Sequence, residues 1–427
     1  MKVSVITYNI LLKYEPDYHF WVFTDKMRLS DKMKALVLIL IYLLFINVEK
    51  SYAVYDPVSV SNNKYGIHII DDNDLNSAAA LVNSSGGDWG YVTLVITESN
   101  RNTEKWSGIF KRMERYHLIP IIRLASSLEG DTWQIPQIQQ ADAWADFLES
   151  LPWYTQNRYI ILFNEPNHAK EWGGIINPEG YADILVAFSQ KLKEKSDEFF
   201  ILQAGFDASA PNSSLTRDEA GYLNHMLAYK PDLFDLIDGW TSHSYPNPHF
   251  KGKVTDTGRG SLVTYKWELE FLKSKGIYKS LPVFITETGW PHDQEAQNGS
   301  VFYSTEVVSD YITKAATIVW QDSIITAVTP FLLNYQSYPF ANFSWQKLNS
   351  NKFYPQFDAY RSIAKIKGEP KMKVYPLPDT ENLILVQNNK PSDNNTFIKK
   401  NFDLNFTLTK LVSRIYFSFK KITGVLI

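Results

Sequence analysis

The sequence has no cysteine among its 427 residues, which excludes disulfides, thiolate metal sites and a cysteine nucleophile. It also has no excess of either charge, because 43 Lys and Arg stand against 46 Asp and Glu. That balance offers no basic surface for nucleic acid and no basic block for an anionic membrane. Apolar side chains are plentiful at 44% and aromatic ones reach 15%, enough for a large buried core.

An apolar run near the N-terminus, residues 35–46, has the character of a secretory signal. It is too short for a membrane span, which needs roughly 20 residues, but it fits the roughly 7–15 residues of a signal core. Two lysines precede it, and small residues within 51–53 suit a signal peptidase. We expect translation to start at Met33, residues 1–53 to be an upstream extension plus signal, and the secreted protein to begin near Val54. Retention of the run as an N-terminal anchor is the alternative.

Residues 371–427 are expected to form a C-terminal appendage. An Asn- and Lys-rich stretch, 388–401, is typical of a solvated linker. Short strand-like patterns stand on both sides of it, at 373–377, 383–387 and 402–408. They fit either a small β appendage or the start of a second domain.

Between residues 54 and 370, strand-like and helix-like segments alternate. Short apolar runs bounded by turn residues are typical of parallel strands that are buried on both faces. The eight runs are 65–70, 91–97, 119–125, 159–163, 200–205, 239–244, 283–286 and 325–333. The amphipathic stretches between them are clearest at 106–116, 141–151, 181–195, 262–275 and 306–320. This repeat predicts an α/β protein with a closed (β/α)8 TIM barrel.

The first predicted strand argues against two other kinds of site. An open doubly wound sheet usually carries a Gly-rich phosphate loop there, and residues 69–73 contain no glycine. A metal-dependent hydrolase barrel would need a His-x-His pair, whereas His68 stands alone and is expected to be a core residue. We therefore expect neither a metal ion nor an organic cofactor.

Two glutamates follow predicted strands that face each other across the barrel. Glu165 ends the fourth run and Glu287 the seventh, 122 residues later. The C-terminal ends of barrel strands form the active-site face, so both carboxyl groups can reach one ligand. Two carboxyl groups about 5–5.5 Å apart suit retaining glycoside hydrolysis, one as acid/base and one as nucleophile. Either glutamate alone would more often be a solvated or salt-bridged residue.

The residues around these glutamates resemble motifs of the clan A glycoside hydrolases, barrel enzymes that include the family 5 cellulases and the family 39 xylosidases. Residues 163–166, Phe-Asn-Glu-Pro, are similar to the strand-four signature of the group, and residues 285–290, Ile-Thr-Glu-Thr-Gly-Trp, to its strand-seven segment. Residues 243–245, His-Ser-Tyr, are similar to its strand-six motif. The resemblance covers roughly residues 64–366.

The resemblance implies a role for each matched residue. Glu165 would be the acid/base and Glu287 the nucleophile. Asn164 would contact the sugar 2-hydroxyl, and Tyr245 would hydrogen-bond the nucleophile. The implied reaction is double displacement on a β-linked glycan. A transglycosylase with the same residues and a non-catalytic glycan-binding barrel are the alternatives.

Two positions depart from the motifs of the group. The second strand lacks the arginine that many members place beside the nucleophile, and Arg123 on the third strand is the candidate replacement, with Glu287 as its partner. The strand-eight tryptophan is also missing, so Trp290 or Tyr335 is expected to stack on the sugar. The expected substrate-binding residues are Arg123, Asn164, Trp172, His243, Tyr245, Trp290, Asn334 and Tyr335.

Ring-bearing side chains on long loops favour an oligo- or polysaccharide over a small glycoside, because aromatic faces pack against the C–H face of a pyranose. These loop residues are Trp172, His249, Tyr335, Tyr338 and Trp345. We expect a monomer that has no nucleic-acid partner and that meets a membrane only if the N-terminal run is kept as an anchor.

Overall fold

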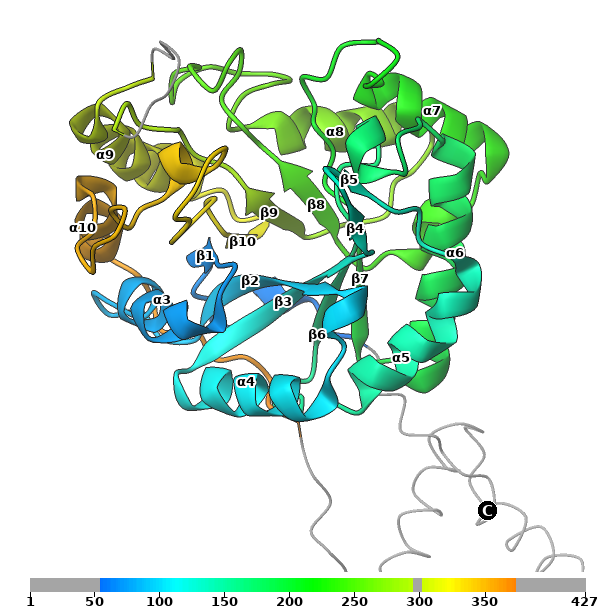
Figure 1. Cartoon of the computed structure of the whole chain (residues 1–427), viewed down its shortest axis with the longest axis horizontal. Helices are drawn as coiled ribbons and strands as arrows, with labels where there is room; N and C mark the ends of the chain where they lie inside the picture. The colour runs from blue at the N-terminus through cyan, green and yellow to red at the C-terminus, as the bar shows by residue number, and fades with distance from the viewer. Residues whose placement is uncertain (1–53, 295–301, 374–427) are drawn as a thin grey trace, which may run out of the picture. The chain divides into compact units, whose positions relative to one another are not determined.

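A computed structural model describes residues 54–294 and 302–373 and shows a barrel of eight parallel strands (Figure 1). The strands are β1 (Gly66–His68), β2 (Gly90–Thr97), β3 (Leu118–Ala125), β6 (Arg158–Leu162), β7 (Phe199–Gln203), β8 (Trp240–His243), β9 (Val283–Glu287) and β10 (Ile325–Val328). They form a five-stranded sheet, β1-β2-β3-β6-β7, and a three-stranded sheet, β8-β9-β10. Parallel bridges from Tyr65 to Val328 and from Leu202 to Gly239 join the two sheets. The predicted closed barrel is therefore confirmed.

One α-helix follows each strand and lies outside the barrel (Figure 1). The helices are α3 (Leu75–Val82), α4 (Thr103–Arg115), α5 (Ala141–Glu149), α6 (Pro178–Lys195), α7 (Glu219–Tyr229), α8 (Thr264–Ser274), α9 (Thr305–Lys314) and α10 (Pro355–Ser362). Four of them begin at a side-chain cap, because Asn102, Asn177, Asp218 and Ser304 each accept a hydrogen bond from an N–H three residues on. The five predicted amphipathic stretches are all helical, and α3, α7 and α10 complete the set.

The strands are buried on both faces, as their apolar runs predicted. On β6, Tyr159 and Ile161 point into the barrel, where they meet rings such as Phe200 and Phe284. Ile160 and Leu162 belong to the larger cluster between strands and helices. Each such side chain stabilises the fold by about 1.5–3 kcal/mol relative to an exposed position. The rigid barrel that results holds the loops at the C-terminal ends of the strands.

Three features of the structure differ from the sequence predictions. The eighth strand ends at Val328 and not at residue 333. Met372 forms an antiparallel bridge with Thr155, so the barrel domain continues at least to residue 373 and does not end at 370. A two-stranded hairpin, β4 (Leu128–Glu129) and β5 (Thr132–Trp133), stands after β3 and was not predicted. The Met372 bridge pairs residues far apart in the sequence, whereas the hairpin is a local pairing.

The predicted export signal and the strands predicted beyond residue 373 lie outside the described residues. Within 54–294 and 302–373, no helix combines the length and apolar character that a membrane crossing requires.

Candidate active site

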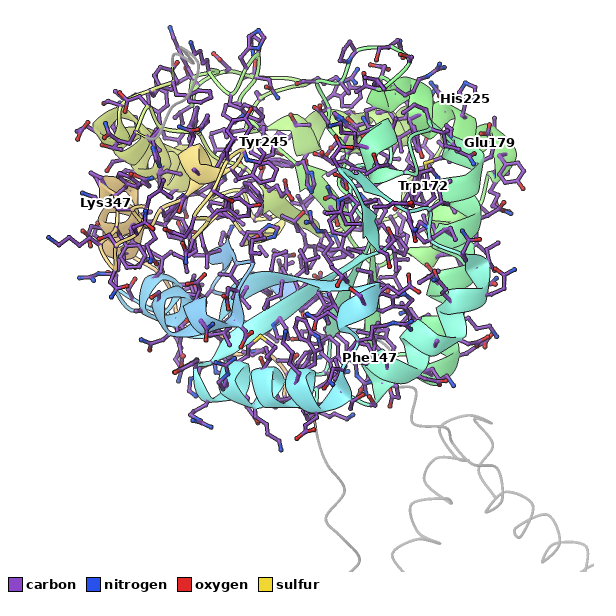
Figure 2. All side chains as sticks on the ribbon, viewed as in Figure 1. Phe147, Trp172, Glu179, His225, Tyr245 and Lys347 are labelled. Carbon is purple, nitrogen blue, oxygen red and sulfur yellow. The ribbon has the colours of Figure 1, made fainter. Side chains whose placement is uncertain are left out.

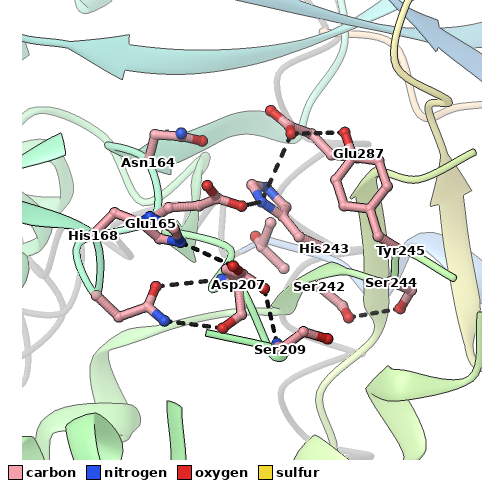
Figure 3. A network of polar contacts seen from close by, with 12 residues as sticks. Asn164, Glu165, His168, Asp207, Ser209, Ser242, His243, Ser244, Tyr245 and Glu287 are labelled. Carbon is pink, nitrogen blue, oxygen red and sulfur yellow. Dashed lines mark hydrogen bonds and ion pairs between the residues drawn. The ribbon is translucent and has the colours of Figure 1, made fainter. Parts of the chain in front are cut away.

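A cavity of about 800 Å³ opens at the C-terminal ends of the strands. Its lining comes from the ends of most strands and from the loops that follow them. The charged residues that line it are Arg123, Glu165, His168, Glu171, Asp207 and Glu287. Both predicted catalytic glutamates therefore face the same cavity (Figure 3).

An unusual backbone presents Glu165 to the cavity. Consecutive strand residues point to opposite faces, yet Asn164 and Glu165 both line the cavity. The chain achieves this just after β6, where Phe163 and Glu165 take positive φ angles of 72° and 28°. Such conformations cost on the order of 1–3 kcal/mol each, and they persist where surrounding contacts fix them. Here the Glu165 N–H donates to the carbonyl of Gly205 (3.1 Å), and its own carbonyl accepts from the N–H of His168 (2.8 Å).

His243 is the hydrogen-bond partner of the Glu165 side chain. Its Nδ1 lies 2.8 Å from Glu165 Oε1 (Figure 3). The imidazole fits there because residue 205 is glycine, since a Cβ at this position would lie 2.2 Å from the ring. Burial lowers the pKa of His243, but the charge of Glu287 and the contacts with Glu165 outweigh burial and raise it overall. The Glu165 carboxyl group thus has a buried imidazole as its hydrogen-bond partner.

Glu287 is held as a carboxylate by donors on both of its oxygens. Arg123 Nη1 lies 2.7 Å from Oε1, and the Tyr245 hydroxyl donates to Oε2 at 3.1 Å. A bulge between Ser242 and His243 sets the register that pairs His243 with Glu287. Burial alone would raise the pKa of Glu287, but the charges of His243 and Arg123 and the Tyr245 hydrogen bond lower it overall. This side chain is thus ionised and shielded, as a nucleophile must be.

His68, expected in the core, is fully buried but lies beside the site. Its Nδ1 is 4.0 Å from Glu287 Oε1, and its ring packs edge-on against Phe331. Burial and the nearby Arg123 lower its pKa to about 3, so the ring is neutral at the pH at which proteins work. His68 therefore adds no charge to the carboxylate.

The separation of the two carboxyl groups is short. One oxygen of Glu165, one of Glu287 and one nitrogen of His243 all lie within 4.8 Å of one another. Inverting glycosidases need about 6.5–9.5 Å between carboxyl groups to admit a water molecule, whereas retaining ones need about 5–5.5 Å. An oxygen-to-oxygen distance of at most 4.8 Å is nearer to the second range than to the first.

The same three residues are of the types that ligate a divalent metal ion, so the fit of a metal needs testing. Both oxygens of Glu287 are already bonded to Arg123 and Tyr245, and the guanidinium would stand next to the ion and repel it. Glu165 and His243 satisfy each other. Hydrogen bonding accounts for this cluster better than metal ligation does.

The predicted substrate contacts divide into two groups. Arg123, Asn164, Tyr245 and Tyr335 line the cavity, and Arg123 also donates to Asn164 Oδ1. His243 forms the second group: it is buried, does not line the cavity, and contacts Glu165.

Three of the predicted contacts were wrong. Trp172, which is labelled in Figure 2, is fully buried and packs against Phe163 and Tyr181, so it cannot touch a ligand. Trp290 is 2% exposed, and its Nε1 donates to a backbone carbonyl. Asn334 lies outside the cavity and donates to Asp74. Each follows a strand in sequence, but its loop folds back into the core.

Sequence reasoning missed further residues of the cavity, among them His168, Asp207, Glu171 and Trp133. His168 Nε2 lies 2.9 Å from Asp207 Oδ2, and this contact raises the pKa of His168 despite burial. Burial and the charge of Glu165 raise the pKa of Glu171 to about 7. Trp133 reaches the cavity from the hairpin that follows β3. His168 and Glu171 lie only a few residues after Glu165, which was the one signal available.

Comparisons with known proteins support the fold. No protein-family model matches the sequence, and no curated protein sequence matches it. Among solved structures, a glucosidase from Croceicoccus marinus matches with a TM-score of 0.51 and 10% identity, over 72% of this chain and 68% of that one. An endo-β-1,4-glucanase from Xanthomonas axonopodis pv. citri matches at 0.45 and 13% identity, over 70% of this chain and 98% of that one. The first likeness shows that this chain shares its α/β fold with TIM-barrel glycoside hydrolase structures.

Proposed function

We propose that this protein is a retaining glycoside hydrolase that cleaves β-linked glycosides by double displacement. The observation that carries the proposal is the environment of the two glutamates, which share one cavity at short separation but have different partners. Glu287 accepts from Arg123 and Tyr245, which favour the ionised form, while Glu165 has His243 as its side-chain hydrogen-bond partner. Two carboxyl groups with different surroundings at one site are typical of acid–base division of labour.

In the first step, a carboxylate oxygen of Glu287 attacks the anomeric carbon. The bond between that carbon and the leaving oxygen breaks, and Glu165 transfers its proton to that oxygen. The leaving group departs as an alcohol, and the sugar is left in ester linkage to Glu287. His243, 2.8 Å from Glu165, orients the carboxyl group for the transfer.

In the second step, the roles of Glu165 reverse. Its carboxylate takes a proton from water, and the water oxygen bonds to the anomeric carbon as the bond to Glu287 breaks. Arg123 and Tyr245 stabilise the carboxylate that is released. Two inversions at the same carbon give net retention.

The test is Glu287→Ala, assayed on aryl β-glycosides with and without azide. We expect turnover to fall by about 10³-fold or more. Azide should restore it by occupying the space of the lost carboxylate, and the product should be a glycosyl azide of inverted configuration. Glu104→Ala, an exposed glutamate on α4, is the matched control and should keep wild-type activity. Wild-type turnover in Glu287→Ala would refute the proposal.

A further inference from the structure

One side of the cavity is built almost entirely from phenylalanine. We call it the aromatic wall, and it consists of Phe250, Phe331, Tyr335, Phe340 and Phe343. Its rings form a continuous edge-to-face chain, with centroids 5.2 Å apart for Phe250 and Phe343, 5.7 Å for Phe343 and Phe331, and 5.4 Å for Phe331 and Phe340. The chain ends at Tyr335, 5.4 Å from Phe340. Such a wall is rigid and presents apolar surface to a ligand.

The aromatic wall reaches the reacting atoms. The ring of Tyr245 lies 5.1 Å from Phe250 and 6.0 Å from Phe343, and its hydroxyl donates to Glu287. A group that packs on the wall is therefore next to the bond that is broken, and not several sugar units away from it.

Most of the charged and amide side chains of the cavity gather elsewhere. Asn164, His168, Glu171 and Asp207 come from the loops after β6 and β7, whereas the wall comes from the loops after β8 and β10, where Asn247 and His249 are its polar neighbours. A sugar bound as the glycone needs partners for its hydroxyl groups, and these loops supply them. The aromatic wall is therefore available to bind the aglycone, the part of the substrate that leaves with the oxygen.

The aromatic wall offers little to a second sugar. Tyr335 carries the one hydroxyl among its five residues, and Tyr245 already donates its own hydroxyl to Glu287. Asn247, at the edge, accepts from the backbone N–H of Phe250. A pyranose buried here would lose water from hydroxyls that find few replacements, whereas an apolar group loses nothing of the kind.

Loop aromatics predicted an extended cleft, but several of these residues do not reach the cavity. Trp172 and Trp345 are 0% and 2% exposed, so neither can bind a glycan chain. Tyr338, 66% exposed, lies outside the cavity.

From these observations we infer that the substrate is a β-glycoside with a bulky apolar aglycone, alkyl or aryl, which packs against the aromatic wall. The inference rests on the proposed hydrolase function and narrows its substrate class.

The test uses methyl, butyl and octyl β-glycosides of one sugar, chosen as the glycone that the enzyme accepts best. Their leaving alcohols have nearly equal acidity, so differences in kcat/KM report contacts with the aglycone. We expect kcat/KM to rise by about tenfold or more from methyl to octyl. The β-linked disaccharide of the same sugar should stay well below the octyl glycoside.

Phe340→Ala connects the preference to the aromatic wall. Phe340 is 40% exposed, so its removal leaves the core intact, which an unchanged Tm will check. We expect the octyl-to-methyl ratio of kcat/KM to fall by about tenfold, to near unity. Tyr338→Ala, on the same loop but outside the cavity, is the matched control and should keep the wild-type ratio.

The outcomes separate the two proposals. Hydrolysis of the methyl glycoside or the disaccharide without an octyl preference would overturn the inference and leave the hydrolase function standing. So would an octyl preference that Phe340→Ala does not change. If no glycoside of any kind were hydrolysed, both proposals would fall together.

Discussion

Two pairs of glutamates in this barrel have opposite surroundings. Glu165 and Glu287 face the cavity, and Arg123 together with Tyr245 keeps Glu287 ionised. The second pair, Glu219 and Glu268, is fully buried on α7 and α8.

Within the described residues, neither member of the second pair forms an ion pair, although the charge of Arg259 acts on Glu219. Glu268 accepts from Trp240 Nε1 at 2.9 Å, a neutral donor on β8. Burial raises the pKa of Glu268 to about 7, and burial together with the charge of Glu268 raises the pKa of Glu219 well above its usual range. The two carboxyl groups interact, which is favourable when one of them keeps its proton.

The comparison shows which features distinguish Glu165 and Glu287 from the second pair. Closeness is common to both pairs, and so is burial of at least one member. Among these four residues, only Glu165 and Glu287 line a cavity, and only Glu287 accepts from both an arginine and a tyrosine. Three changes would break or sharpen this contrast.

The largest effect is expected from Glu165→Ala. Loss of the acid/base should slow hydrolysis of alkyl β-glycosides by about 10²–10⁴-fold, because their leaving oxygen needs a proton. Aryl glycosides with acidic leaving groups need less protonation, so the rate at which they form the glycosyl-enzyme should fall less than the rate for alkyl glycosides. Azide should then give a glycosyl azide of retained configuration, opposite to that expected from Glu287→Ala. An azide product of inverted configuration would mean that Glu165 is the nucleophile and Glu287 the acid/base.

A smaller effect is expected from Tyr245→Phe. The change removes one hydrogen bond to the Glu287 carboxylate and keeps the ring against Phe250 and Phe343. A hydrogen bond to a charged group contributes about 1.5–3 kcal/mol, so kcat/KM should fall by roughly 10–100-fold. Because that bond holds the pKa of Glu287 down, the acidic limb of the pH–rate profile should also move to higher pH. An unchanged acidic limb would show that Tyr245 does not support the nucleophile.

The smallest effect on activity, but a measurable one on stability, is expected from Glu268→Gln. The pKa of Glu268 is raised from 4.5 to about 7 in the folded protein, so the folded state binds more protons between these values. Stability should therefore decrease as pH rises from about 4.5 towards 7 and stay lower above it.

Gln keeps an acceptor for Trp240 and removes the titrating charge. The difference in Tm between pH 5 and pH 8 should therefore become smaller by roughly a few degrees. Turnover should stay within about threefold of wild type, as for a change remote from the reacting atoms. A pH dependence of Tm equal to that of the wild type would show that Glu268 does not titrate with folding.

The sequence predicted the barrel well because strands buried on both faces read as apolar runs, as 159–163 and 283–286 illustrate. Glu165 and Glu287 were predictable for a related reason, since a polar residue directly after such a run lies at the active-site face.

Loops were predicted less well. Trp172 and Trp290 were predicted to line the cavity, but both are buried. The sequence pattern around an aromatic loop residue does not distinguish one that packs into the core from one that contacts a ligand. The aromatic wall was missed for the same reason, since Phe250 and Phe340 are 90 residues apart and meet only through Phe343 and Phe331. Such contacts depend on how loops fold onto each other, which no local pattern records.

The central claim is that Glu287 forms a covalent bond to the sugar. A 2-deoxy-2-fluoro β-glycoside with a good leaving group slows both steps, and it slows release of the sugar enough to trap that intermediate. Proteolysis and mass spectrometry of the inactivated enzyme should then locate one glycosyl group on the peptide that contains Glu287. Labelling of Glu165 or of any other residue, or turnover with inversion and no adduct, would contradict the account.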